Sequence, residues 1–180
     1  MRQITKNLGQ AKLAQVLLKH APYVELPFLE RSKSRQVATL STGEDVLLVL
    51  HRGGVMRGGD VLVDELGQLI RVRAAAEKVL RVTTQSPFEL MRASYHLGNR
   101  HIPIEIHEAY LQLEYDSVLS DMLKQLGCDV AVVEQPFEPE FGAYGGGHKH
   151  GHDATFPEDY ALAQAAFHAH AHDADRSHEH

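Results

Sequence analysis

The chain of 180 residues has little of several features that would place it in a common protein class. It has one cysteine, Cys128, which excludes an internal disulfide and any metal site of the CxxC type. We expect Cys128 to be a small buried core residue. No stretch approaches eighteen uncharged apolar residues, and the first ten residues lack the apolar centre of a signal peptide. We therefore expect a cytoplasmic protein with no membrane partner.

The chain also lacks a basic patch. Its net charge is −6, and the segment beyond residue 147 carries six Asp or Glu against Lys149 and Arg176. Nucleic-acid binding requires a positively charged surface, so we expect no nucleic-acid partner. The acidic balance of this segment instead favours cations.

Histidine is abundant, and eight of the thirteen histidines lie in the last 33 residues. They are His148, His150, His152, His168, His170, His172, His178 and His180. Imidazole is mostly neutral near pH 7 and is a good ligand for Zn, Cu and Ni. A purification tag is normally an unbroken run, whereas other residues separate every pair here. A solvated tail is the other alternative, and we interpret the segment as metal-binding.

The first part of the chain, residues 1–76, is predicted to be a small all-β domain. Short runs rich in Val and Leu are separated by turn residues, as in a small barrel or sandwich. The predicted strands are 35–40, 44–51, 60–64 and 68–74. Residues 10–20 favour a helix, although an edge strand fits them too.

The second part, residues 77–145, is predicted to be a ferredoxin-like domain, which makes the fold class α+β. The predicted elements are a strand at 78–84, a helix at 86–99, strands at 101–106 and 109–115, a helix at 117–127 and a strand at 128–137. This order is β-α-β-β-α-β, the split βαβ arrangement.

Three local signals define the first of these helices and the hairpin after it. Ser86 and Glu89 are expected to form a capping box, and Gly98 is expected to be the left-handed residue that ends the helix. The turn of the hairpin is expected at His107–Glu108.

Residues 146–180 are predicted to be a flexible, disordered His-rich tail without metal. A glycine triplet at residues 145–147 marks the start of this segment and is typical of a flexible exit. Residues 163–172 favour a helix in isolation, but so short a helix without an apolar face to bury is marginal in water.

The densest chemical signal outside the tail is the run YHLGNRHIPIEI, residues 95–106. A helix is expected to end at Gly98, and His101 is expected to open a strand at a corner that a partner chain could approach. An exposed polar residue without function is the alternative for His101. His96 is expected to be a partly buried helix histidine.

The sequence resembles the urease accessory nickel metallochaperones (the urease accessory protein E family). Five blocks carry the resemblance and occur in the family's order from about Val24 to the tail. They are ELPFLERSKSRQ, RGGVMRGGDVL, YHLGNRH, FEPEFGAYG and the His-rich end.

The resemblance implies a homodimer joined through the ferredoxin-like domains and an N-terminal domain that binds peptide. It implies that His101 from each of two protomers holds one ion, completed by His148, His150 or His152. The family's auxiliary His-x-His pair is replaced here by Tyr115–Asp116–Ser117, so that site is expected to be absent. The implied function is delivery of Ni(II) through a partner GTPase to the urease apoprotein, together with its other accessory proteins.

The ligand chemistry agrees with this implication. Two imidazoles leave most coordination positions of Ni(II) open, so that other donors can add and exchange. Cu(II) should bind such a site more tightly, and Zn(II) should compete closely. Because imidazole must be deprotonated to bind, metal should be lost as pH falls below the histidine range.

Two other functions fit parts of the sequence. A hydrolytic metalloenzyme needs three fixed ligands, an open position and a general base, but only Glu105 and His107 lie near His101 in the sequence. We therefore expect no enzyme activity and interpret that pair as a solvated strand face. A passive nickel or zinc buffer would need the tail alone.

The charged stretch 29–35 is expected to be a solvated loop or a partner surface. Residues 52–60 are expected to form tight turns.

Overall fold

The computed structural model describes residues 1–11 and 15–140, and the residues up to Glu140 form one compact unit. Its strands form two sheets, one built before residue 75 and one built after it. The predictions for the tail, residues 146–180, lie outside the described residues.

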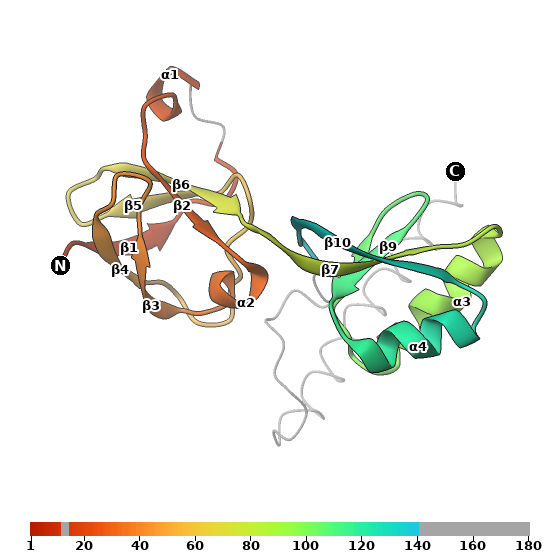
Figure 1. Cartoon of the computed structure of the whole chain (residues 1–180). Helices are drawn as coiled ribbons and strands as arrows, with labels where there is room; N and C mark the ends of the chain where they lie inside the picture. The colour runs from red at the N-terminus through yellow and green to blue at the C-terminus, as the bar shows by residue number, and fades with distance from the viewer. Residues whose placement is uncertain (12–14, 141–180) are drawn as a thin grey trace, which may run out of the picture. The chain divides into compact units, whose positions relative to one another are not determined.

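The first sheet has six strands in the order β2-β6-β5-β1-β4-β3 (Figure 1). Their bounds are β1 (Gln3–Asn7), β2 (Tyr23–Leu26), β3 (Arg35–Thr39), β4 (Asp45–Val49), β5 (Val61–Asp64) and β6 (Leu69–Ala74). The pairs β1/β4 and β2/β6 are parallel, and the others are antiparallel. A bridge between Val24 and Leu40 joins the two edges of the sheet, which favours the barrel alternative.

Alternating apolar residues of these strands form the first core. Val46 and Leu48 in β4 point inward and are fully buried, whereas the positions between them are more exposed. They pack with Ile4, Leu62 and Ile70 in one cluster. The four strands predicted in this region are therefore confirmed.

The second sheet has four strands in the order β10-β7-β9-β8. Its elements are β7 (Ala76–Thr83), α3 (Pro87–Gly98), β8 (Glu105–Ile106), β9 (Leu111–Glu114), α4 (Ser117–Gln125) and β10 (Asp129–Pro136). The predicted order β-α-β-β-α-β is present. In Figure 1 both helices lie on the same side of this sheet.

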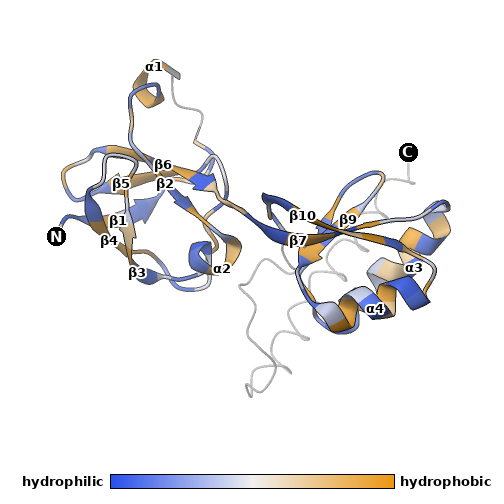
Figure 2. Ribbon diagram, viewed as in Figure 1, coloured by the Kyte–Doolittle hydropathy of each residue, from blue (hydrophilic) through white to orange (hydrophobic). Residues whose placement is uncertain are grey.

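The second core lies between the two helices and the sheet. Ala93 and Leu97 of α3 and Leu123 of α4 are fully buried against Leu80 and Leu113 of the strands. Both helices carry apolar and polar residues in Figure 2. Apolar residues at intervals of three or four positions are the amphipathic pattern from which the two helices were predicted.

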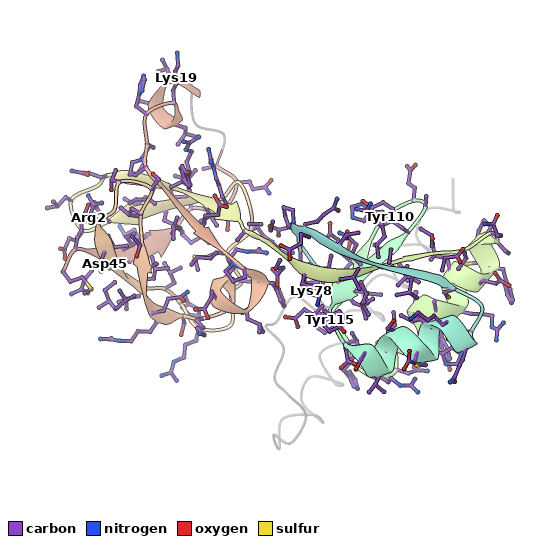
Figure 3. The ribbon with its side chains drawn as sticks, in the orientation of Figure 1. Arg2, Lys19, Asp45, Lys78, Tyr110 and Tyr115 are labelled. Carbon is purple, nitrogen blue, oxygen red and sulfur yellow. The ribbon has the colours of Figure 1, made fainter. Side chains whose placement is uncertain are left out.

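Polar side chains on the strands of the second sheet contact one another and nearby aromatic rings. The guanidinium of Arg81 donates to Gln112 (3.2 Å) and to Gln135, and it lies 4.5 Å from the ring centre of Tyr110. The ammonium of Lys78 lies 4.1 Å from the ring centre of Tyr115 (Figure 3).

Several short elements were not predicted. Strands β1 and β2 and the one-turn helix α2 (Phe28–Arg31) were missed. Their apolar alternation covers four or five residues, which is too short for a clear periodic signal. Within the predicted helix at 10–20, the structure has α1 (Gln15–Leu18), and residues 12–14 lie outside the description.

Arg31 corrects the prediction of a solvated loop at residues 29–35. Its side chain is fully buried, and its guanidinium donates to the carbonyls of Leu26 (3.1 Å) and Met56 (2.9 Å). A charged side chain is buried only where it is paired and hydrogen-bonded, and sequence alone does not reveal such partners.

The predicted turns at residues 52–60 are present, with positive φ at Gly53 and Gly59. Among the helices that the structure describes, none is long and apolar enough to cross a membrane.

Candidate metal centre

His101 lies just after helix α3 in a left-handed backbone conformation. Its φ is 55°, and it is the only non-glycine residue with positive φ in the part of the chain that the structure describes. Its N–H donates to the carbonyl of Gly98 (2.9 Å), and the N–H of Ile102 donates to the carbonyl of Leu97 (3.2 Å). These two bonds form a Schellman motif, in which the left-handed residue is usually glycine. The prediction that Gly98 takes this position is wrong.

Packing explains why the helix runs past Gly98. Leu97 is fully buried, and Ile102 packs against the same core. This apolar contact across the motif fixes the turn and leaves the left-handed position to His101. The left-handed conformation costs an L-residue roughly 1–2 kcal/mol, although histidine tolerates it better than most. Strained residues of this kind cluster at functional sites.

The imidazole of His101 is available to a ligand. The residue is exposed, and its ring forms no hydrogen bond or ion pair with the described part of the chain. It lies at the C-terminal end of α3, where the partial negative charge of the helix favours a cation. The guanidinium of Arg100 donates to the carbonyl of His96 (3.1 Å) and so occupies part of that negative end.

His96 is half-buried in the last turn of α3, as predicted. Its ring centre lies 5.5 Å from that of the exposed Tyr95, in an edge-on arrangement. His96 is therefore a second imidazole near the end of the helix, and its ring contacts that of Tyr95.

Glu105 and His107 do not form a solvated strand face with His101. Strand β8 begins only at Glu105, because His101 is in a left-handed turn and Pro103 has no N–H for a ladder. His107 Nε2 lies 2.8 Å from Glu105 Oε1, and its ring stacks on Tyr110 with centres 4.1 Å apart. The hairpin joins Ile106 to Leu111, so its loop is residues 107–110 rather than His107–Glu108.

The carboxylate of Glu105 is a structural acceptor. Its Oε2 accepts from the backbone N–H of Glu138 (2.8 Å) and from the side chain of Gln112 (3.3 Å). With His107 at Oε1, both carboxylate oxygens of Glu105 have hydrogen-bond partners in the described structure.

Cys128 is buried, as predicted, with 5% of its surface exposed. Burial raises the pKa of its thiol, and the carboxylates of Glu89 and Asp129 raise it further. The thiol therefore stays protonated near neutral pH and is poorly suited to bind a metal ion.

The described residues contain no group of three or more His, Cys, Asp or Glu side chains that could hold a metal ion. Of the predicted ligands, the structure places His101 alone. The eight tail ligands, His148, His150, His152, His168, His170, His172, His178 and His180, lie outside the described residues. Within the description, one chain thus offers a single exposed imidazole at this end of α3.

An exposed apolar stripe on α3 leads toward His101. Phe88, Met91 and Tyr95 are 63%, 62% and 66% exposed, and their spacing places them on one face of the helix. Exposed apolar patches of this kind mark interaction surfaces. The sequence analysis missed this stripe, although its spacing, offset from the buried stripe of Leu90 and Ala93, could have indicated it.

The described residues define a protein with a β-rich N-terminal part and an α+β C-terminal part, in which the exposed imidazole of His101 lies beside an apolar helix face. Two family models match it: the UreE urease accessory protein N-terminal domain over residues 4–75, and the UreE urease accessory protein C-terminal domain over residues 77–180. The chain belongs to the urease accessory protein UreE family.

Close relatives agree with this assignment. The urease accessory protein UreE of Cupriavidus necator is 61% identical over 158 residues, which cover 88% of this chain and 82% of the relative. That of Ralstonia nicotianae is 61% identical over 171 residues, covering 94% and 81%. That of Burkholderia vietnamiensis is 57% identical over 171 residues, covering 94% and 86%. These proteins are urease accessory proteins rather than urease itself.

Proposed function

We propose that the chain binds Ni(II) at His101 and delivers it, through a partner GTPase, to the urease apoprotein in the cytoplasm. The observation that carries the proposal is the exposed His101 imidazole, held in a left-handed turn at the negative end of α3. An accessory protein of urease has a metal centre to assemble, and a lone imidazole suits transfer better than permanent binding.

A homodimer is part of this proposal. One imidazole per chain is too few for a stable site, whereas two chains related by a twofold axis would supply two. The stripe of Phe88, Met91 and Tyr95 supports such a contact, because it lies on the helix that ends next to His101. A second copy of α3 would cover the exposed rings of both stripes.

The tail would supply the remaining ligands. We propose that His148, His150 or His152 completes the shell around the ion, and that the later histidines collect further ions. Zn(II) and Cu(II) would compete for these donors, so selectivity must come from metal supply and from the partner.

The three parts of the chain would have separate tasks. We propose a peptide-binding domain at residues 1–76, a domain for metal binding and dimerisation at 77–145, and a metal-binding tail at 146–180. None of these parts is proposed to catalyse a reaction.

The experiment compares two full-length variants in an assay of urease activation. His101→Ala should abolish nickel delivery while most of the bound nickel remains, because the tail keeps its ligands. Replacement of all eight tail histidines by alanine should lower the amount of bound nickel and leave part of the activation. Normal activation by His101→Ala would contradict the proposal and favour a passive nickel or zinc buffer, which needs only the tail.

A further inference from the structure

The chain segment that precedes the His-rich tail is held by two arginines that lie between strands of the first sheet, Arg31 at the end of α2 and Arg57 in the loop between β4 and β5. Arg31 Nη1 donates to Glu138 Oε1 (3.0 Å), and Arg57 Nη1 donates to Glu138 Oε2 (3.1 Å). The backbone N–H of Gly58 also donates to Glu138 Oε1 (2.8 Å). We call Arg31, Arg57, Gly58 and Glu138 the Glu138 clasp.

The clasp is well shielded from water. The side chains of Arg31, Arg57 and Glu138 are 0%, 17% and 27% exposed. Arg31 also donates to the carbonyl of Phe137, and Arg57 to that of Pro139, so both neighbours of Glu138 are fixed. Charge-assisted hydrogen bonds with little exposure are stronger than ion pairs on the surface.

The same segment is bonded to the chain that follows His101. The N–H of Glu138 donates to Glu105 Oε2 (2.8 Å), and the N–H of Glu140 donates to the carbonyl of Ile104 (2.8 Å). Residues 138–140 therefore connect the first sheet to the loop between α3 and β8. The tail leaves from Glu140, beside that loop.

The number of residues on either side of the Glu140–Ile104 hydrogen bond limits the distances from it to His101 and to His148. Ile104 is three residues from His101, so their Cα atoms lie within about 11 Å of each other. Glu140 is eight residues before His148, a span of at most about 29 Å. A span of this length is long enough for the proposed sharing of an ion between His101 and the first tail histidines. The end of β10 at Pro136 pairs with Ala76 instead, at the start of β7.

We propose that Glu138 is a positioning residue for metal binding, and that the first sheet thereby sets where the tail begins relative to His101. This inference rests on the proposed function, because it assumes that the tail histidines and His101 share an ion. Arg31 and Arg57 are proposed to act through Glu138, which both of them bind.

Gly58 provides a test that leaves every charge in place. A Cβ at Gly58 would lie 2.9 Å from Glu138 Oε1, which must then move, and its φ is not in the left-handed region. A Cβ at Gly54 would meet nothing within 4 Å, so Gly54→Ala is the matched control. Glu138→Gln is a second way to weaken the clasp, and Glu134→Gln on β10 is its control.

The first readout uses metal-free protein. Amide hydrogen exchange at Glu140 should be on the order of tenfold faster in Gly58→Ala and Glu138→Gln than in the wild type, because charged hydrogen bonds hold this segment closed. Exchange in the two controls should be unchanged. Equal exchange at Glu140 in all five proteins would overturn the inference. This readout needs no nickel, so it is independent of whether the proposed function holds.

The second readout is nickel affinity measured by calorimetry. Alanine at His148, His150 and His152 should weaken nickel binding about tenfold in the wild-type background, since a tethered ligand raises avidity by at least this factor. The same change should have about a threefold effect or less with Gly58→Ala. An equal effect in both backgrounds would overturn the inference. A normal delivery assay with His101→Ala would instead refute the proposed function.

Discussion

At the scale of single residues, glycine would suit the backbone at position 101 better than histidine, but only histidine supplies an imidazole ligand. The Schellman motif at the end of α3 would be most stable with glycine at this position, and the chain has histidine there. The imidazole is exposed and not engaged by the described residues, so it adds little to the packing that holds the turn. We therefore infer that histidine occupies position 101 because its imidazole binds a ligand.

Two substitutions of His101 separate the backbone from the ligand. His101→Gly should be at least as stable as the wild type and about 1 kcal/mol more stable than His101→Ala, because alanine pays the left-handed strain and glycine does not. Both variants lack the imidazole and should lose nickel delivery equally. Urea denaturation measures the stabilities. Equal stability of the two variants would show that φ at this position is not left-handed.

A second prediction concerns pH. Burial raises the pKa of Glu114, and the nearby Glu77 raises it further. The folded state then binds more protons than the unfolded state, so stability falls as pH rises from the ordinary glutamate pKa through the raised one. Glu114→Gln should remove this penalty, giving a slightly higher urea midpoint than the wild type at about pH 7.

The difference should vanish near pH 3.5, where the carboxyl is protonated in both states. Glu134→Gln, at an exposed carboxylate on the edge strand β10, serves as the control and should not stabilise at pH 7. A wild type that is as stable as Glu114→Gln at pH 7 would contradict the assignment.

At the scale of helices and strands, the two helices of the second domain begin differently. Asp116 accepts from the N–H groups of Val118 (2.7 Å) and Leu119 (2.9 Å), whereas the side chain of Ser86 makes no such bond. The capping box predicted from Ser86 and Glu89 is therefore absent, and Pro87 alone marks the start of α3.

This contrast predicts unequal effects of alanine at the two caps. Asp116→Ala should lower the free energy of unfolding by about 1 kcal/mol, because two amide groups at the start of α4 lose their acceptor. Ser86→Ala should change it by less than about 0.3 kcal/mol. Thermal or urea denaturation of both variants checks this. A larger loss at Ser86 than at Asp116 would contradict the hydrogen bonding described.

Elements with a long periodic pattern could be predicted from the sequence. Both helices, β7 and β10 have eight or more residues, and their buried residues follow the expected spacing. The hairpin at β8 was predicted too long, because the turn at His101 depends on packing of Ile102 and not on local propensity. Gly127, the last residue of the helix predicted at 117–127, lies just past α4 and has a φ of 88°.

The site could be predicted only in part. His101 was identified from its sequence motif and is exposed at a corner, as expected. The clasp of Arg31 and Glu138 joins residues 107 positions apart. No local pattern encodes such a pair, since each charge taken alone resembles an ordinary surface residue.

At the scale of the whole molecule, the described residues of one chain supply only part of the proposed metal site. At the C-terminal end of α3, the described residues provide the exposed imidazole of His101, an apolar stripe on the same helix and a held segment from which the tail leaves. A twofold partner would complete all three, because it would add an imidazole, cover the stripe and bring a second tail. Dimerisation and metal binding are thus expected to depend on each other.

The most direct test is a crystal structure of the nickel-loaded full-length protein with anomalous data at the nickel edge. The account predicts one nickel ion between the His101 imidazoles of two protomers, with Phe88, Met91 and Tyr95 buried in their contact. Nickel bound only by tail histidines of a single protomer, with His101 exposed to solvent, would contradict it.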